Sequence, residues 1–340
     1  MAKKLHYQIK KPIDLSNLLE VKGHDFEKGT DLHEVIKSMK KTGIQATELA
    51  KSIEIAHIMQ REKASIFLSY TSNMVSSGVR EPIKYLVKHK KVHVLVTSAG
   101  GVEEDAIKSI MPFRIGNFYA NGKTLFDSGI VRIGNIFATT EHYTYFEFFI
   151  RKVFDRLANE KAKNNNSGIC IVTPSEIASM MGKLIGEEKN CDEKSSILYY
   201  AYKNSIPLFC PGIVDGSIGD ILYYYKMKNN KFYVDVGEDH KKIIDFVLSC
   251  KKTGAIILGG GISKHYVLNA NIFKDGLDYA VYITTADSYD ASDSGGDQEE
   301  AITWAKIKPE ALRAKVFCDA SIAFPLLVAG AFVNNDKNKL

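Results

Sequence analysis

The chain has 340 residues, 45% hydrophobic and 25% charged, a composition typical of a soluble globular protein. It holds no apolar run of the roughly 18 residues that a membrane-spanning helix needs, and its lysine-containing start lacks the apolar core of a secretory signal. Five scattered cysteines, without a CxxC pair or a Cys/His cluster, argue against a disulfide framework and a zinc or other metal site. They favour reduced thiols in a cytoplasmic protein.

The net charge of +5 is carried by lysines spread through helical patterns, so we expect neither a nucleic-acid patch nor a membrane surface. The segment from Asp275 to Ala305 is the exception, with eight acidic residues and no lysine, arginine or histidine. Such a concentration of negative charge suggests a site for a cation. An acidic surface loop would have the same composition.

In chain order, residues 1–30 read as an N-terminal arm of short polar pieces. Asp31 can cap the helix that follows, and Gly43 is expected to separate two helices. Six short apolar runs then alternate with helical patterns, one of which covers 299–307. The apolar runs are ASIFLSYT (64–71), VHVLVTSAGG (92–101), IPLFCPGI (206–213), GAIILGGG (254–261), YAVYITTA (279–286) and AKVFCDAS (314–321).

Apolar strands with little alternation, separated by helices, predict an α/β fold of Rossmann-like type, a parallel sheet with helices on both faces. No repeat or Ser/Pro-rich linker divides the chain. We therefore expect a single domain over residues 31–333, followed by a polar tail over 334–340.

Small or acidic residues follow all six apolar runs. Ligands of open α/β sheets bind beyond the carboxyl ends of the strands, where small residues allow close approach and free backbone amides can bind phosphate. This pattern favours a nucleotide site. No G-x-G-x-x-G follows the first strand, and glycines at strand ends are also typical of plain turns.

The only tryptophan, Trp304, precedes Lys306 by two residues. On a helix the two side chains would diverge, whereas in an irregular loop they could share a pocket. There the aromatic wall would remove water from the amine and favour its neutral, nucleophilic form. The alternative is a surface lysine whose stem stacks on the ring.

Other candidates lie near strand ends. His265 follows the glycine-rich run and can act as a general base or bind a substrate amine, or it lies on a helix surface. Asp215 and Asp220 can bind cationic or ribose groups, or cap a helix. Together the residues point to a nucleotide site, carboxylates that can hold a polyamine, and an amine beside an aromatic ring.

Long motifs distributed along the chain resemble those of deoxyhypusine synthases, from about Val21 to Phe332. The motifs are YTSNMVSSGVRE (70–81), LVTSAGGVEED (95–105), DGSIGD (215–220), ILGGGISKH (257–265), SDSGG (292–296), WAKI (304–307) and DASIAFPLL (319–327). The resemblance implies an NAD-dependent aminobutyltransferase in which Lys306 is the nucleophile. Spermidine is oxidised, 1,3-diaminopropane leaves, and the 4-aminobutyl group passes through an imine on Lys306 to a lysine of the translation factor 5A precursor.

The same resemblance assigns the binding residues. The NAD site falls on Ser72, Asn73, Met74, Val75, Ser76, Ser98, Ala99, Gly100, Glu104, Asp215, Gly260, Thr285, Ala286, Asp319 and Ala320. The spermidine site falls on Glu103, Glu104, Asp220, His265, Asn269, Ala291, Ser292, Asp293, Glu300, Trp304 and Lys306. His265 is expected to help move protons.

The family also implies a homotetramer, a dimer of dimers whose subunits share active sites. The chain departs from the family in having Ala291 and Ala305 where glycine is frequent, and Ser98 where threonine is frequent. Two other functions stay open. One is a homospermidine synthase-type transfer to putrescine, and the other is a non-catalytic NAD-binding subunit, against which the presence of Lys306 argues.

Overall fold

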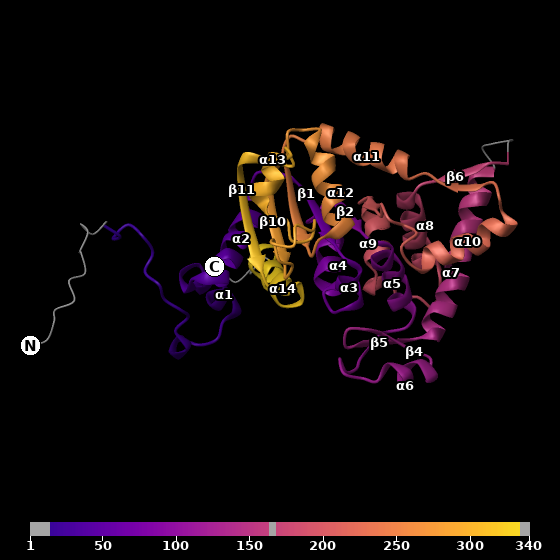
Figure 1. Ribbon diagram of the computed structural model, residues 1–340, viewed down its shortest axis with the longest axis horizontal. Coiled ribbons are helices and arrows are strands. Elements are labelled where there is room, and N and C mark those ends of the chain that lie inside the picture. The colour runs from indigo at the N-terminus through magenta and orange to yellow at the C-terminus, as the bar shows by residue number, and fades with distance from the viewer. Residues whose placement is uncertain (1–13, 163–167, 334–340) are drawn as a thin grey trace, which may run out of the picture.

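The computed structural model describes residues 14–162 and 168–333, so most of the first half of the predicted arm and the whole predicted tail lie outside the described residues. A six-stranded sheet in the order β11-β10-β9-β1-β2-β7 forms the centre (Figure 1). Every neighbouring pair in it is parallel. Its strands are β1 (Ser65–Tyr70), β2 (Val94–Thr97), β7 (Leu208–Phe209), β9 (Thr253–Leu258), β10 (Leu277–Thr284) and β11 (Ile307–Phe317).

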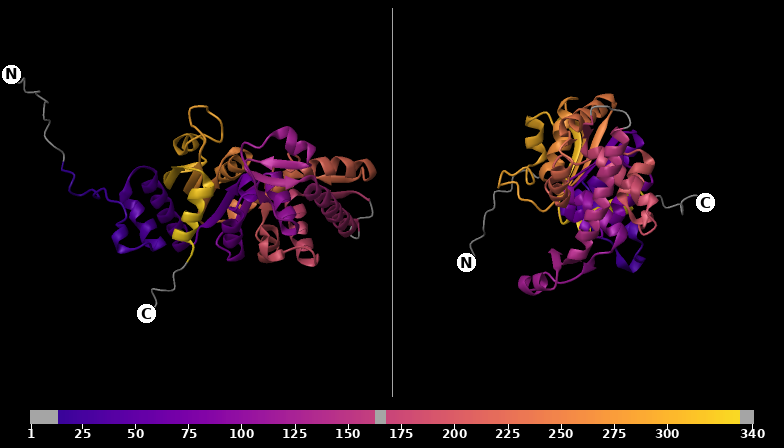
Figure 2. Two further views of the ribbon diagram at one scale, coloured as in Figure 1. Left: turned by 90° about the horizontal axis from the view of Figure 1, so that it is seen from below. Right: turned by 90° about the vertical axis from the view of Figure 1, so that its right-hand side faces the viewer.

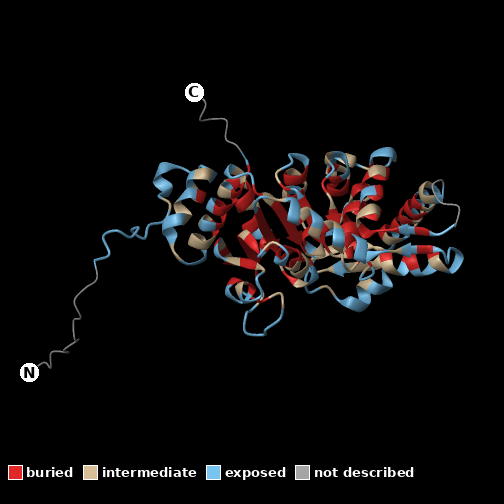
Figure 3. Ribbon diagram, turned by 90° about the horizontal axis from the view of Figure 1, so that it is seen from above, coloured by how far each residue is buried: buried red, intermediate tan, exposed pale blue. Residues whose placement is uncertain are grey.

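Each of the six strands overlaps one of the apolar runs, and the prediction of a parallel sheet is confirmed. Only β11 differs markedly, because it begins at Ile307, well before the run at 314–321. The strands are largely buried (Figure 3). Their side chains alternate between two apolar clusters: Phe67 packs in one, while Ile66 and Leu68 pack in the other. Burial on both faces explains why the runs lack a polar alternation.

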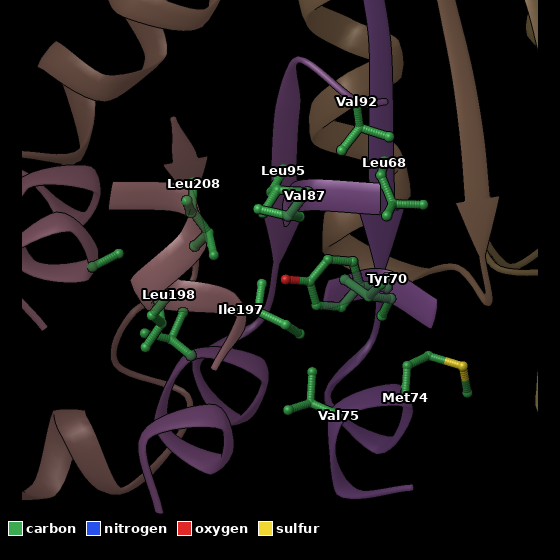
Figure 4. Packing of buried hydrophobic residues seen from close by; sticks show 14 of the residues in the cluster. Leu68, Tyr70, Met74, Val75, Val87, Val92, Leu95, Ile197, Leu198 and Leu208 are labelled. Atoms are coloured by element: carbon green, nitrogen blue, oxygen red, sulfur yellow. The ribbon is translucent and has the colours of Figure 1, made fainter. Parts of the chain in front are cut away.

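Helices cover both faces, as expected for this class. One cluster contains residues of α11 (Val236–Ser249), α12 (Gly261–Ile272) and α13 (Gln298–Thr303). The other contains residues of α1 (Leu32–Thr42), α2 (Ile44–Arg61), α3 (Ser72–Ser76), α4 (Arg80–Lys88), α5 (Ala99–Ile110), α9 (Ile197–Asn204) and α14 (Ala320–Ala331). Figure 4 shows part of this second layer, where Leu68 and Tyr70 of β1 lie beside Leu95 of β2. Each such buried side chain stabilises the fold by about 1.5–3 kcal/mol.

The two predicted N-terminal helices form as expected. Asp31 caps α1, accepting hydrogen bonds from the backbone N–H groups of His33 (3.0 Å) and Glu34 (3.2 Å). Gly43 separates α1 from α2 with φ of 92°, a conformation that glycine adopts without strain.

Two smaller sheets were not predicted. An antiparallel module of β3 (Arg114–Ile115), α6 (Gly122–Asp127), β4 (Ile130–Ile133) and β5 (Ile136–Thr139) extends from the body (Figure 1). A parallel pair of β6 (Cys170–Val172) and β8 (Phe232–Val234) lies at the far end with α7 (Thr140–Ala162), α8 (Pro174–Glu187) and α10 (Ser217–Lys228). Two short 3-10 turns, η1 (Phe26–Lys28) and η2 (Glu193–Ser195), complete the described elements. None of the helices in this described part combines the length and hydropathy needed to span a bilayer.

Candidate active site

The strand order reverses between β1 and β9. The chain proceeds from β1 to β2 and β7 on one side, and from β9 to β10 and β11 on the other. Ligands of doubly wound sheets bind in the crevice beyond the carboxyl ends at such a switch point. Thr71 and Gly259 follow these two strands, and a Cβ atom on Gly259 would lie only 3.1 Å from the Thr71 Oγ1. The two strand ends therefore meet at the expected ligand site.

The sequence-predicted dinucleotide residues lie along this carboxyl edge. Ser72 to Ser76 form α3, and Ser98 is the N-cap residue of α5, without a side-chain hydrogen bond to that helix. Gly260 occupies the N-cap position of α12, and the Asp319 side chain caps α14. The remaining members follow a strand or lie in the first turns of these helices: Ala99, Gly100, Glu104, Asp215, Thr285, Ala286 and Ala320.

Glycine is required where the backbone segments of this edge approach each other. A Cβ atom on Gly100 would lie 2.7 Å from the Ser72 Cβ, where α5 meets α3. One on Gly260 would lie 2.4 Å from the Ser294 Cα. The amino end of α12 has no side-chain cap, so its first backbone N–H groups are available to an anion.

The amino ends of α5 and α10 are already occupied by carboxylates. Asp215 accepts a hydrogen bond from the Ala99 N–H (3.0 Å), and Glu103 accepts one from the Ile218 N–H (3.1 Å). Asp215 therefore caps α5 rather than the helix that follows it in sequence. Unlike α5 and α10, α12 therefore has no carboxylate bound at its amino end at the switch point.

Glu103 and Glu104 lie side by side on α5 and are buried, with 5% and 6% of their surface exposed. Burial raises the pKa of Glu104 to about 7, against the opposing effect of the hydrogen bond donated by Ser76. Burial also raises the pKa of Glu103, and the charges of Asp215 and Asp220 add to this shift. A cation bound here would restore the charge of these carboxylates.

Lys306 lies on a turn, so the predicted helix over 299–307 is wrong beyond Thr303. Ala305 has a left-handed conformation with φ of 54°, and the Lys306 N–H returns to the Ala301 carbonyl (3.0 Å). This reversal brings the two side chains together, because the Lys306 Nζ lies 5.7 Å from the centroid of the Trp304 ring. Trp304 is 63% exposed, so it does not form a closed aromatic wall around the amine.

Lys306 shares a small cavity with acidic side chains. The lining residues are Lys264, Leu268, Asp293, Gly296, Asp297, Glu300, Ala301, Trp304 and Lys306. Its volume of about 30 Å³ is enough for one or two water molecules and too small for a polyamine. In this conformation the cavity does not accommodate a larger cation.

His265 is held by an acid of the loop after β10. Its Nδ1 lies 2.6 Å from the Asp293 Oδ1, while the buried Asp293 Oδ2 has no hydrogen-bond partner among the described residues. That oxygen can accept a hydrogen bond from a substrate ammonium. Asn269 lies one helical turn beyond His265 on α12.

The eight acids between Asp275 and Ala305 do not form a single cluster. Asp278 pairs with Lys308 (2.7 Å), and Glu299 pairs with Arg313. Only Asp293, Asp297 and Glu300 line the cavity. The loop that carries Ala291, Ser292 and Asp293 projects from the body (Figure 2).

Within one chain the Lys306 backbone lies far from the predicted dinucleotide residues. The Lys306 carbonyl accepts a hydrogen bond from the Leu277 N–H (3.0 Å), which places it at the amino ends of β10 and β11. Thr284, at the carboxyl end of β10, is seven residues further on, roughly 23 Å along an extended strand. The acidic loop and α13 connect the two edges.

A family model for deoxyhypusine synthase matches residues 34–331. The chain belongs to the deoxyhypusine synthase family. It is 43% identical to a protein named probable deoxyhypusine synthase from Methanocaldococcus jannaschii, covering 91% of this chain and 96% of that one. It is also 43% identical to the deoxyhypusine synthase of Senecio vernalis, covering 92% and 89% of the two chains.

A solved structure supports the same assignment. A crystal structure from Entamoeba histolytica, assigned as a deoxyhypusine synthase, is similar with a TM-score of 0.61 and 27% identity, covering 92% of this chain and 96% of that one. The family membership makes this chain an enzyme of the transferase class.

Two charged residues of the cavity were not predicted as site residues from the sequence. Lys264 and Asp297 line it beside the predicted members. A signal for Lys264 was present, because Val267 and Leu268 follow it at three and four residues and predict that it lies on the buried face of its helix. Asp297 caps α13 by accepting a hydrogen bond from the Glu300 N–H (2.9 Å), a role that its position before that helix would have indicated.

Proposed function

We propose that this member of the family is a deoxyhypusine synthase that transfers the 4-aminobutyl group of spermidine to a lysine of the translation factor 5A precursor. The observation that supports this most directly is the position of Lys306. Its amine lies beside Trp304 in a cavity lined by Asp293 and Glu300. An amine next to carboxylates that can seat a polyamine is what an imine-forming transfer requires.

The cofactor in this proposal is NAD, which supplies a hydride acceptor when bound. The residues at the switch point suit it: Gly100 and Gly260 let the chain segments of this edge pack closely, and the open amino end of α12 can bind a pyrophosphate. Ser98 retains a hydroxyl at the start of α5.

The side chains of the cavity have separate tasks. Asp293 and Glu300 pair with ammonium groups of spermidine, and Trp304 lies against its methylene chain. Loss of a hydride from the carbon next to the secondary amine leaves an imine, which the Lys306 amine attacks as 1,3-diaminopropane departs. The acceptor lysine then displaces Lys306, and return of the hydride reduces the new imine. His265, held by Asp293, moves protons during these exchanges.

A second copy of the chain completes the site in this proposal. Lys306 and the switch point lie at opposite edges of one sheet, and the cavity around Lys306 is too small for the substrate. Two subunits related by a two-fold axis would place the switch point of one beside Lys306 of the other. Such shared sites agree with the tetramer, a dimer of dimers, that the family resemblance implies.

The decisive test is a transfer assay with two acceptors. Purified protein is incubated with spermidine and NAD, together with either the factor 5A precursor or putrescine, and both products are measured by mass spectrometry. The proposal expects one aminobutyl addition on the precursor. Transfer to putrescine alone would instead indicate a homospermidine synthase.

The nucleophile is tested by borohydride trapping with labelled spermidine. We expect the label on Lys306 in the wild-type protein and no label in Lys306→Arg, because a guanidinium does not form the imine. Lys308→Arg is the matched control, since Lys308 lies two residues away and pairs with Asp278. Label at another residue, or full activity of Lys306→Arg, would contradict the proposal.

A further inference from the structure

Lys264 is a buried amine inside the cavity that contains Lys306. It lies in the first turns of α12, directly before His265, and only 3% of its surface is exposed. Its Nζ lies 5.0 Å from the centroid of the Tyr282 ring. Burial lowers the pKa of this amine, while the charge of Asp293 opposes that effect. A lysine is rarely buried in this way without a task.

The partners of Lys264 are carbonyl groups of the acidic loop. Its Nζ donates to the Asp293 carbonyl and to the Gly296 carbonyl (2.8 Å). Both of these residues line the cavity, and Asp293 in turn holds His265 through its side chain. Lys264 is therefore connected to the catalytic histidine by two successive hydrogen-bonded contacts.

A second lysine also holds this loop by a backbone carbonyl. Lys315 of β11 donates to the Gly295 carbonyl (2.9 Å). Lys315 and Gly295 are not among the described residues that line the cavity. Both lysines therefore donate hydrogen bonds to carbonyl groups of one loop. The carbonyl groups that Lys264 contacts belong to residues that line the cavity, whereas the carbonyl group that Lys315 contacts does not.

We propose that Lys264 is a positioning residue for spermidine, which fixes the 293–296 loop so that Asp293 meets both His265 and a substrate ammonium. This inference rests on the proposed function and adds to it a determinant of polyamine binding. Asp293 lines the cavity, and its second carboxylate oxygen is buried and has no hydrogen-bond partner among the described residues. Without the anchor the loop, which projects from the body, would have to be ordered by the substrate itself.

The experiment compares Lys264→Met, Lys264→Arg and Lys315→Met in the full-length protein. Methionine keeps the length of the stem and removes the ammonium, along with the cost of burying its charge. We expect Lys264→Met to raise the KM for spermidine by about 10- to 100-fold, the effect of losing hydrogen bonds from a charged group, with the KM for NAD changed less than threefold. Lys264→Arg should recover at least part of the spermidine affinity, and Lys315→Met should leave it within about threefold of wild type.

Amide hydrogen exchange over residues 292–297 provides a readout that needs no activity. Exchange should accelerate in both methionine variants, because each loses an anchor of the loop. A Lys264→Met protein with the wild-type KM for spermidine would overturn the inference, and so would an equal rise in that KM in Lys315→Met. A wild-type protein without spermidine-dependent NADH formation would overturn the proposed function itself, which separates the two failures.

Discussion

The imidazole Nδ1 of His265 lies 2.6 Å from the Oδ1 of Asp293, a contact that joins the first turns of α12 to the loop after β10. These two segments begin at the carboxyl ends of neighbouring strands, β9 and β10. The contact therefore links the open amino end of α12, where an anion can bind, to the acids that extend toward Lys306. A change at Asp293 should affect the cavity without disturbing the sheet.

Asp293→Asn should lower the rate of spermidine-dependent NADH formation by about 100-fold, because an amide neither orients His265 as a carboxylate does nor neutralises an ammonium. The double variant with His265→Gln should be little worse than the worse single variant, since the two residues act as a unit. Glu299→Gln is the matched control. Glu299 belongs to the same acidic segment but pairs with Arg313. The rate of NADH formation in Glu299→Gln should therefore stay near that of the wild type.

Glu104→Gln should change how stability depends on pH. Burial raises the pKa of Glu104 in the folded protein to about 7, above its ordinary value near 4.5, so the folded state favours the protonated form. The stabilisation from this group is complete below about pH 4.5 and is lost as the pH rises through about 7. The loss amounts to at most roughly 3 kcal/mol.

The measurement is thermal or urea unfolding of the ligand-free protein at pH 5 and pH 8.5. The variant should gain stability relative to wild type at the higher pH, while the two proteins unfold more alike at pH 5. Glutamine can still accept the Ser76 hydrogen bond, so the comparison isolates the charge. A constant difference between the two proteins at both pH values would show that Glu104 is ionised in the folded state throughout this range.

The central sheet could be predicted because its six strands are buried on both faces, so each one appears in the sequence as an apolar run. The antiparallel module at 114–139 was missed because its strands are short and partly exposed, with Ile115 of β3 82% exposed. Local pattern gives little signal for such strands.

The site was predictable only in part for a similar reason. Small and acidic residues at strand ends indicated the switch point, whereas the helix expected over 299–307 hid the turn at Ala305. Nothing in the local pattern favours a left-handed alanine, because that conformation is costly for any residue with a Cβ atom. The distance between Lys306 and the switch point depends on how β10 and β11 pair in the sheet, which residue spacing along the chain does not reveal.

Asp105→Ala should destabilise the fold by about 3–5 kcal/mol, because it leaves the charge of Arg80 buried and unpaired. The Asp105 carboxylate accepts hydrogen bonds from the Arg80 Nε (2.7 Å), the Ser196 hydroxyl (2.7 Å) and the Leu198 N–H (2.8 Å). Neither member of the ion pair is more than 3% exposed. Asp105 thus joins α4 and α5 to the start of α9.

Denaturant unfolding measures this loss. Asp127→Ala is the control, since the exposed Lys123–Asp127 pair on α6 should contribute less than about 0.5 kcal/mol. Comparable losses in both variants would show that the Arg80 charge finds another partner. Asp105 directly follows Glu103 and Glu104 in the sequence. A large loss of stability in Asp105→Ala would show that Asp105 stabilises the fold, whereas the two preceding acids are assigned to ligand binding.

Ala305→Gly should stabilise the protein while loosening the position of Lys306. Ala305 and Ala291 have φ values of 54° and 57°, in the left-handed region that costs an alanine about 1–2 kcal/mol. Glycine avoids that cost but loses about 0.5–1 kcal/mol through its greater freedom in the unfolded chain. The expected net gain is about 0.5–1 kcal/mol at either position.

Ser205→Gly provides the matched control for strain relief away from the cavity, because Ser205 ends α9 with φ of 56°. All three glycine variants should unfold at higher denaturant concentration than wild type. Ala305→Gly should also slow formation of the borohydride-trapped adduct, and Ser205→Gly should not, since Ala305 precedes the nucleophile in the turn that brings Lys306 beside Trp304. Slower trapping in Ser205→Gly as well would assign the effect to the fold as a whole, and unchanged trapping in Ala305→Gly would show that the strained turn does not position the amine.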